Sequence, residues 1–184
     1  MNAIIFCTAP GEVRALRILN ELRSCGFPEA QLSVLSPEHA LAGGFGPTDT
    51  PDAQPARSPD WGPAEMPVIL SGLVHRTCMT RPKLGRLMGA GPLMLGLNAP
   101  SAKSEGDGFA GELANAGLPG ALAAHYEQQL AAGKILISAQ AANPEECLRV
   151  QAALGAARAE DIIVRAETSS HETDRRLEQY GRAA

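Results

Sequence analysis

Two strand-helix-strand patterns, one at each end of the chain, constrain its fold more than any other feature. In the first, residues 3–8 form a short apolar, β-branched run, after which Val and Leu recur at helical spacing. A Gly-Phe-Pro sequence at residues 26–28 is a helix stop, and residues 32–35 form a second apolar run. We therefore predict a β-α-β unit over about residues 2–36.

The same order of elements returns near the other end of the chain. Residues 134–139 form an apolar run, and Asn143 can cap a following helix whose first turn contains Pro and Glu146. Residues 162–164 follow as a last short strand. This pattern predicts a second β-α-β unit over about residues 133–165.

Two such units in one sheet predict an α+β fold of the ferredoxin-like type, a split β-α-β sandwich. We expect a four-stranded antiparallel sheet with helices on one face. A long Pro/Gly-rich insertion, about residues 40–118, would lie between the second and third strands. Residues 1–165 would then form a single domain, followed by a polar C-terminal tail over residues 166–184.

Apolar residues occupy both faces of the predicted strands. Ile4 and Phe6 point one way while Ile5 points the other, and Leu136 likewise opposes its apolar neighbours. An antiparallel sheet with one wetted face should alternate apolar and polar residues, so the face away from the helices must also be covered. The cover is either the insertion or a second subunit.

The insertion begins with a proline-rich loop over residues 43–67, where Pro recurs at every fourth position. No helix or central strand tolerates that pattern. From residue 66 to residue 104 there is no acidic residue, while basic residues, Gly and Leu are frequent. We predict a candidate interaction surface there, formed by Arg76, Arg81, Lys83, Arg86, Gly85, Gly89, Gly91, Leu93 and Leu95.

Several short motifs occur in the same order as in a known family. They are the Gly-Phe-Pro turn at 26–28, Ala-Gly-Pro-Leu at 90–93, Gly-Lys-Ile-Leu-Ile at 133–137 and Asn-Pro-Glu-Glu at 143–146. Over about residues 2–165, the proline-rich stretch excepted, the chain resembles the bacterial heat-induced general stress protein domain, of the glycine-rich type. It departs from that family in a shortened glycine zipper and in residues 43–82, which have no counterpart. The resemblance implies a non-enzymatic, stress-associated role without catalytic residues.

Composition argues against several classes of function. The net charge of −4 and an aromatic content of 4% do not favour a nucleic-acid partner, since neither a basic field nor stacking rings are abundant. The four His residues are far apart in sequence, so we predict neither a metal site nor a cofactor. The four Cys residues form no CxxC pair, and the N-terminus has no signal-peptide pattern. We therefore predict a cytoplasmic protein without a membrane span.

One thiol-enzyme hypothesis is open to test. His75 and Cys78 would be neighbours at helical spacing, and nearby Arg residues would favour a thiolate. A carboxylate to orient the His is lacking nearby, so the pair reads better as a surface His beside a packing Cys. We predict that the protein is not an enzyme.

These observations together predict a binding or scaffold module that self-associates, most simply as a dimer. One alternative is attachment to an anionic surface, membrane or nucleic acid, through residues 66–104, whose Leu residues beside basic ones suit interfacial insertion. Another alternative is a sensor that binds a small molecule in the cleft between the sheet and the insertion.

Overall fold

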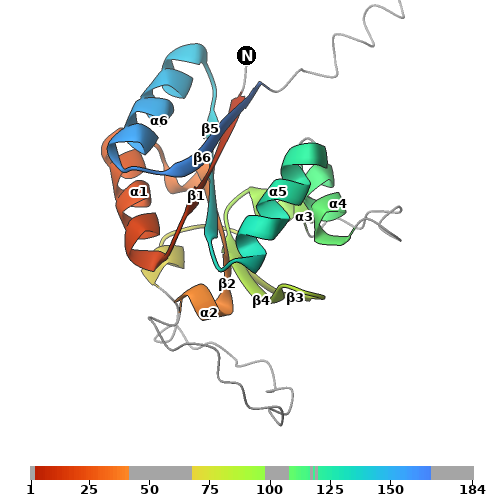
Figure 1. The fold of residues 1–184 in the computed structure, drawn as a ribbon. Helices are drawn as coiled ribbons and strands as arrows, with labels where there is room; N and C mark the ends of the chain where they lie inside the picture. Colours follow the sequence, from red (N-terminus) through yellow and green to blue (C-terminus); the bar gives the residue numbers. More distant parts are fainter. Residues whose placement is uncertain (1–2, 42–67, 98–107, 117, 119, 167–184) are drawn as a thin grey trace, which may run out of the picture.

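The described chain begins and ends with a strand, with a β-hairpin and three successive helices in its middle part (Figure 1). The computed structural model describes residues 3–41, 68–97, 108–116, 118 and 120–166 of the 184-residue chain. Its strands are β1 Ala3–Ala9, β2 Leu32–Pro37, β3 Thr77–Arg81, β4 Gly85–Ala90, β5 Ile135–Ala141 and β6 Glu160–Ala166. Its helices are α1 Glu12–Ser24, α2 Glu38–Leu41, α3 Leu93–Leu97, α4 Gly108–Asn115, α5 Gly120–Ala131 and α6 Pro144–Ala156, with the short 3-10 helices η1 Glu29–Gln31 and η2 Val68–Leu70.

Both predicted β-α-β units are present. The first consists of β1, α1 and β2, and the second of β5, α6 and β6. Their strands interleave, since β5 lies between β1 and β2 while β1 lies between β5 and β6. Each of these neighbouring pairs is antiparallel. Neither unit can therefore complete its part of the sheet without a strand of the other.

Within the described residues the sheet has six strands in the order β3-β4-β2-β5-β1-β6, and all neighbouring pairs are antiparallel. The fold belongs to the α+β class, but the predicted four-stranded ferredoxin-like sheet is wrong. The two further strands come from within the segment predicted as an insertion. There β4 pairs with β2, from Val34 opposite Ala90 to Pro37 opposite Leu87. This segment is thus part of the sheet.

The spacing of two glycines makes the β3-β4 hairpin difficult to predict from the sequence. Gly85 and Gly89 lie four residues apart, which favours close helix packing. In the structure both glycines belong to β4, and the turn before it contains Lys83 at φ 70°. Pro82 and Lys83 are the central residues of this turn, which Leu84 N closes by donating to Arg81 O at 3.3 Å, and Pro is favoured at the first central position of such a turn. The turn signal here is a better guide than the spacing of small residues.

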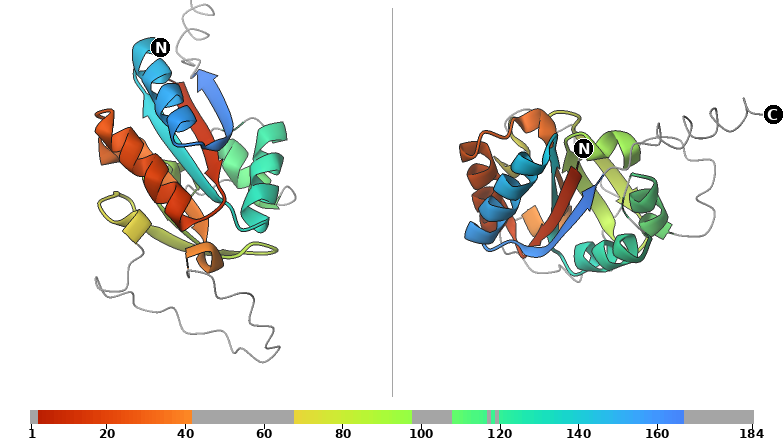
Figure 2. Two further views of the ribbon diagram at one scale, coloured as in Figure 1. Left: turned by 60° about the vertical axis from the view of Figure 1, so that its left-hand side comes forward. Right: turned by 90° about the horizontal axis from the view of Figure 1, so that it is seen from above.

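Helices α1 and α6 cover one face of the sheet (Figure 2). Ile18 and Leu22 of α1 are completely buried there, as is Val150 of α6. They pack with Ile5 and Ile137, which point toward this face from β1 and β5. This layer is the one that the two β-α-β units predict.

Helices α3, α4 and α5 cover the opposite face and form a second apolar core (Figure 2). Phe6 and Leu136 of the sheet pack there with Met94 of α3, Leu113 of α4 and Tyr126 of α5. The prediction of helices on one face only is therefore wrong, whereas the prediction that the outer face must be covered is confirmed. The cover is the chain's own segment between β4 and β5, so the described sheet face does not require a second subunit.

Two segments discussed from sequence lie outside the described residues. The predicted proline-rich loop over residues 43–67 is one. The predicted tail over residues 166–184 is the other, apart from Ala166, which is the last residue of β6.

The start of α6 shows how local sequence fixes the second unit. Glu146 N donates a hydrogen bond to Asn143 Oδ1 at 2.8 Å, and Ala142 N donates one to Glu146 Oε2 at 2.8 Å. A proline occupies the first turn of the helix. The predicted cap is confirmed, and it satisfies two backbone N–H groups at the helix start.

Gly91 lies where the chain passes from β4 to α3 and comes close to β2. Its φ is 103°, and a Cβ atom there would contact the carbonyl oxygen of Leu32 and lie 2.5 Å from Ser33 Cα. We expect Gly91→Ala to lower the free energy of unfolding by roughly 2–4 kcal/mol, because it adds backbone strain and overlap with β2. Urea unfolding followed by circular dichroism measures the change.

Gly155→Ala is the matched control for this substitution. Gly155 lies within α6, and an added methyl group would meet nothing within 4 Å. It should raise the free energy of unfolding by roughly 0.5–1 kcal/mol, because Ala is the better helix former. Equal stability of Gly91→Ala and the unmodified protein would contradict the close approach of β4 to β2.

Candidate interaction surface

The described sheet has two edges, β3 on one side and β6 on the other. β6 pairs with β1 along one of its sides, and within the described residues no strand pairs with its other side. An edge strand presents a row of backbone N–H and C=O groups that can pair with a further strand. The two edges are thus the places where this sheet can be extended.

The open edge of β6 carries apolar side chains. Ile162 and Val164 are 38% and 43% exposed, and they lie two residues apart, on the same face of the strand. Ile163 points to the other face and packs against the core beneath α3, α4 and α5. Branched side chains of this kind are favourable in paired strands. β6 therefore combines exposed apolar surface with open backbone.

The edge formed by β3 is different. Its exposed side chains, Cys78 and Thr80, are small, while Met79 between them is buried. Arg81 at its end is held by α4, because Arg81 Nε donates to Glu112 Oε2 at 2.9 Å and Arg81 Nη2 lies 2.7 Å from the same oxygen. A small, partly polar edge that ends in an ion pair offers little to an apolar partner.

A polar cluster around Asp161 anchors the start of β6. Asp161 has φ 51°, a left-handed conformation, and lies at a register shift between β1 and β6. The buried Thr8 Oγ1 donates a hydrogen bond to Asp161 Oδ2 at 2.9 Å. Lys134 Nζ lies 2.8 Å from Glu160 Oε2 and 3.8 Å from Asp161 Oδ2, and the hydrogen bond to Glu160 raises the pKa of Lys134. These contacts hold the bulge at the first residues of β6.

Helix α5 supplies two more contacts to Asp161. The Tyr126 hydroxyl donates to the backbone oxygen of Asp161 at 2.9 Å, and His125 Nε2 lies 3.5 Å from Asp161 Oδ1. Burial raises the pKa of Tyr126, so its hydroxyl is a protonated donor at neutral pH. Thr8 donates to the carboxylate rather than to the imidazole, so the cluster is not arranged as a nucleophile with its base. It is suited to positioning the strand.

The basic side chains of the predicted surface do not form one patch. The register of the β3-β4 hairpin places Arg81 and Arg86 on opposite faces of the sheet. Arg81 pairs with Glu112 of α4, and Arg86 Nη1 lies 3.4 Å from Glu38 Oε1 of α2. Arg81 and Arg86, which are close in sequence, are thus separated in space, and each is paired with a carboxylate from another segment.

The other residues of the predicted surface occupy several elements. Arg76 precedes β3, Lys83 lies in the hairpin turn, Gly85 and Gly89 belong to β4, Gly91 follows it, and Leu93 and Leu95 belong to α3. Leu93 is buried at 7% exposure, whereas Leu95 is 56% exposed. The edge of β6, by contrast, was not part of the predicted surface, because its position depends on the order of the strands.

The structure does not support the thiol-enzyme hypothesis. Cys78 lies in β3 opposite Met88, so it and His75 are not helical neighbours. Arg86 Nε donates a hydrogen bond to Cys78 Sγ at 3.0 Å. Among the described residues this contact provides a donor to the sulfur but no base.

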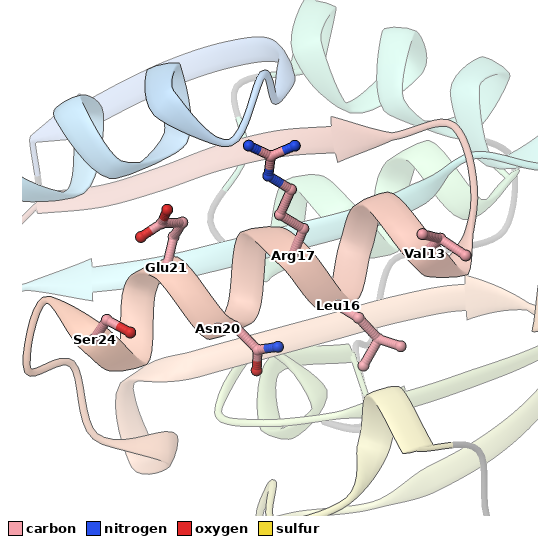
Figure 3. Close-up of a pocket in the computed structure, with 6 residues that line it drawn as sticks. All are labelled: Val13, Leu16, Arg17, Asn20, Glu21 and Ser24. Carbon is pink, nitrogen blue, oxygen red and sulfur yellow. The ribbon is translucent and has the colours of Figure 1, made fainter.

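A shallow hollow of about 440 Å³ lies along the outer face of α1 (Figure 3). It is lined by six residues of this helix: Val13, Leu16, Arg17, Asn20, Glu21 and Ser24. Figure 3 shows Arg17 and Glu21 directed to one side of the helix and Leu16 and Asn20 to the other. These side chains diverge, so the hollow does not gather groups around a ligand.

In the described part of the chain, His, Cys, Asp and Glu side chains nowhere gather in a group of three or more that could hold a metal ion. Likewise, none of the helices in these ranges has the length and apolar character needed to cross a membrane.

Comparison of the chain with protein-family models, with curated proteins and with solved structures finds no match. The resemblance to the general stress protein domain therefore stays a prediction that rests on collinear motifs.

The anchoring role of Thr8 can be tested by Thr8→Val. The substitution keeps a branched side chain but removes the donor to Asp161, so we expect the free energy of unfolding to fall by about 1–3 kcal/mol. Thr80→Val, at an exposed position in β3, is the control and should change it by less than about 0.5 kcal/mol. Urea unfolding that shows equal effects for the two substitutions would contradict the role of Thr8.

Thiol reactivity tests the burial of β1. Burial raises the pKa of the Cys7 thiol to about 12, so this thiol is both protonated and inaccessible at neutral pH. In the native protein we expect a thiol reagent to modify the exposed Cys78 first and to leave Cys7 intact until the protein unfolds. Peptide mass spectrometry identifies the sites, and rapid native labelling of Cys7 would contradict the described core.

Proposed function

We propose that this protein is a non-enzymatic binding module that self-associates, and that the edge of its sheet formed by β6 is the associating element. The observation that carries the proposal is the exposure of Ile162 and Val164 beside an open backbone edge. Burial of such side chains together with new backbone pairing is the usual way in which an edge strand binds a partner.

The two apolar faces of the sheet no longer support self-association. Phe6, Leu35 and Leu136 already pack beneath α3, α4 and α5, so the outer face is covered within one chain. Among the described residues the same side chains pack between the sheet and these helices, where a small-molecule sensor would need a cleft. We therefore propose a contact at the edge of the sheet and not on its face.

Attachment to an anionic surface has less support. Of the five Leu residues that would insert into a membrane interface, four are buried in the second core, and Leu95 alone is exposed; the buried ones are Leu84, Leu87, Leu93 and Leu97. Arg81 and Arg86 point to opposite faces and are paired with Glu residues. A role in the stress response and a cytoplasmic location belong to the proposal as predictions from sequence.

Sedimentation velocity across micromolar concentrations tests the proposal. We expect the full chain to show a reversible monomer-dimer equilibrium, and Val164→Lys to weaken it by roughly tenfold or more, because Lys on an edge strand opposes pairing. Val164 is 43% exposed, so the substitution should leave the monomer folded.

Leu148→Lys is the matched control. Leu148 is 67% exposed on α6, and its substitution removes a surface hydrophobic residue away from the β6 edge. It should leave the dimer unchanged. A full chain that sediments as a monomer at every concentration, or equal effects of the two Lys substitutions, would overturn the proposal.

A further inference from the structure

We infer that the partner of β6 is β6 of a second copy, paired antiparallel about a two-fold axis at Ile163. The inference rests on the proposed function and specifies its partner and its register. The resulting dimer has a continuous sheet in which each copy contributes its six strands.

Symmetry leaves few registers for such a pairing. Residues that stand directly opposite one another in an antiparallel pair lie on the same face of the sheet. Because side chains alternate between faces along the regular part of β6, which keeps one register with β1 from Ile163 to Ala166, a two-fold pairing must be centred on a residue rather than between two residues. Ile163 is the middle residue of the seven in β6, so the pairing that uses the most of the strand is centred on Ile163 or one of its neighbours.

Centring on Ile163 matches the exposed apolar side chains. Ile162 of each copy then lies opposite Val164 of the other, and this happens twice because of the two-fold axis. These are the two β6 side chains that the single chain leaves 38% and 43% exposed. Cross-strand pairs of branched apolar residues stabilise a sheet.

The same register matches charge. It brings Arg165 of each copy to the bulged start of β6 of the other, across from Asp161, again twice. The cluster at the start of β6 has two carboxylates, Glu160 and Asp161, against one ammonium group, that of Lys134. Among the described residues Arg165 makes no ion pair. Arg165 of one copy therefore supplies the positive charge that the cluster of the other copy lacks.

The two neighbouring registers lack both matches. A two-fold axis at Val164 would place Ile163 opposite Arg165, and an axis at Ile162 would place Ile163 opposite Asp161, in each case an apolar side chain against a charge. Neither register brings Arg165 across from Asp161. The sequence of β6 is thus complementary to itself at Ile163 and not one residue further on.

Size sets the expected strength of this contact. β6 is seven residues long, and a strand pair of that length is smaller than the interfaces of stable complexes, which bury roughly 1,600 Å² in total. We therefore expect a weak dimer, with Kd on the order of micromolar to hundreds of micromolar.

Disulfide cross-linking of the full chain tests the register. Both test variants carry Cys78→Ser, which removes the exposed native thiol. In the inferred register two copies of residue 163 are about 4.5–5.5 Å apart at Cα, within reach of a disulfide. Two copies of residue 164 are offset by two positions and lie about 7–8 Å apart, which is too far. We expect Ile163→Cys to form a disulfide-linked dimer under mild oxidation and Val164→Cys to remain largely unlinked.

A charge substitution tests the register a second time, through the Kd of the dimer and without a cross-link. Arg165→Glu places like charges opposite Asp161 in both halves of the dimer, so we expect Kd to rise roughly tenfold. Arg17→Glu, at an exposed position on α1, makes the same change of charge away from β6 and should leave Kd unchanged. Cross-linking by Val164→Cys but not by Ile163→Cys, or equal effects of Arg165→Glu and Arg17→Glu, would overturn the register.

The proposed dimerisation and the inferred register of the β6 pair can be tested separately. If the full chain does not dimerise at any concentration, the proposed function fails and the register with it. If it dimerises and Val164→Lys weakens the dimer, but the cross-linking pattern is reversed, the proposed function stands and only the two-fold pairing at Ile163 is wrong.

Discussion

The structure depends on the apolar character of both faces of its central strands. β1 and β5 present branched or aromatic side chains to either side, as Ile5 and Phe6 do within two consecutive positions. Such a sheet is stable in water only between two layers, because burial of apolar surface is the main force that favours folding. One layer comes from α1 and α6 of the two β-α-β units. The other comes from α3, α4 and α5, which the chain supplies between β4 and β5.

Because helices cover both faces of the sheet, only its two edges can pair with a partner strand. At β3 the side chains are small and Arg81 is tied to α4 through Glu112. At β6 the irregular part of the strand is confined to its start, where Thr8, Tyr126 and Lys134 hold the backbone and carboxylates of Glu160 and Asp161. Beyond this anchor the strand runs in regular register with β1, from Ile163 opposite Phe6 to Ala166 opposite Ala3. A fixed start and a regular, apolar remainder are what a strand needs in order to pair in one register.

Local patterns predicted much of this fold. The alternation of Ile4, Ile5 and Phe6 predicted a strand covered on both faces, and Asn143 with Glu146 predicted the cap that α6 uses. The β3-β4 hairpin could not be read in the same way, because its glycines at four-residue spacing imitate a helix. This hairpin nonetheless determines the architecture, because its two strands extend the described sheet from four strands to six.

The polar cluster around Asp161 and the edge position of β6 could not be predicted from local sequence patterns. Thr8 and Asp161 are 153 positions apart, and only the pairing of β1 with β6 brings them together. The strand at residues 162–164 was predicted, but whether it lies in the middle or at the edge of the sheet depends on the order of all six strands. The predicted surface failed to assemble for a related reason, since strand alternation sends Arg81 and Arg86 to opposite faces.

Hydrogen exchange measured at low and high protein concentration tests the central claim most directly. The claim is that the chain covers both faces of its own sheet and leaves β6 as the element that associates. It predicts that amides of the central strands β1 and β5 are protected even in the dilute monomer, and that raising the concentration slows exchange in β6 alone. Rapid exchange of β1 and β5 in the monomer, or concentration-dependent protection that appears in α3, α4 and α5 rather than in β6, would contradict it.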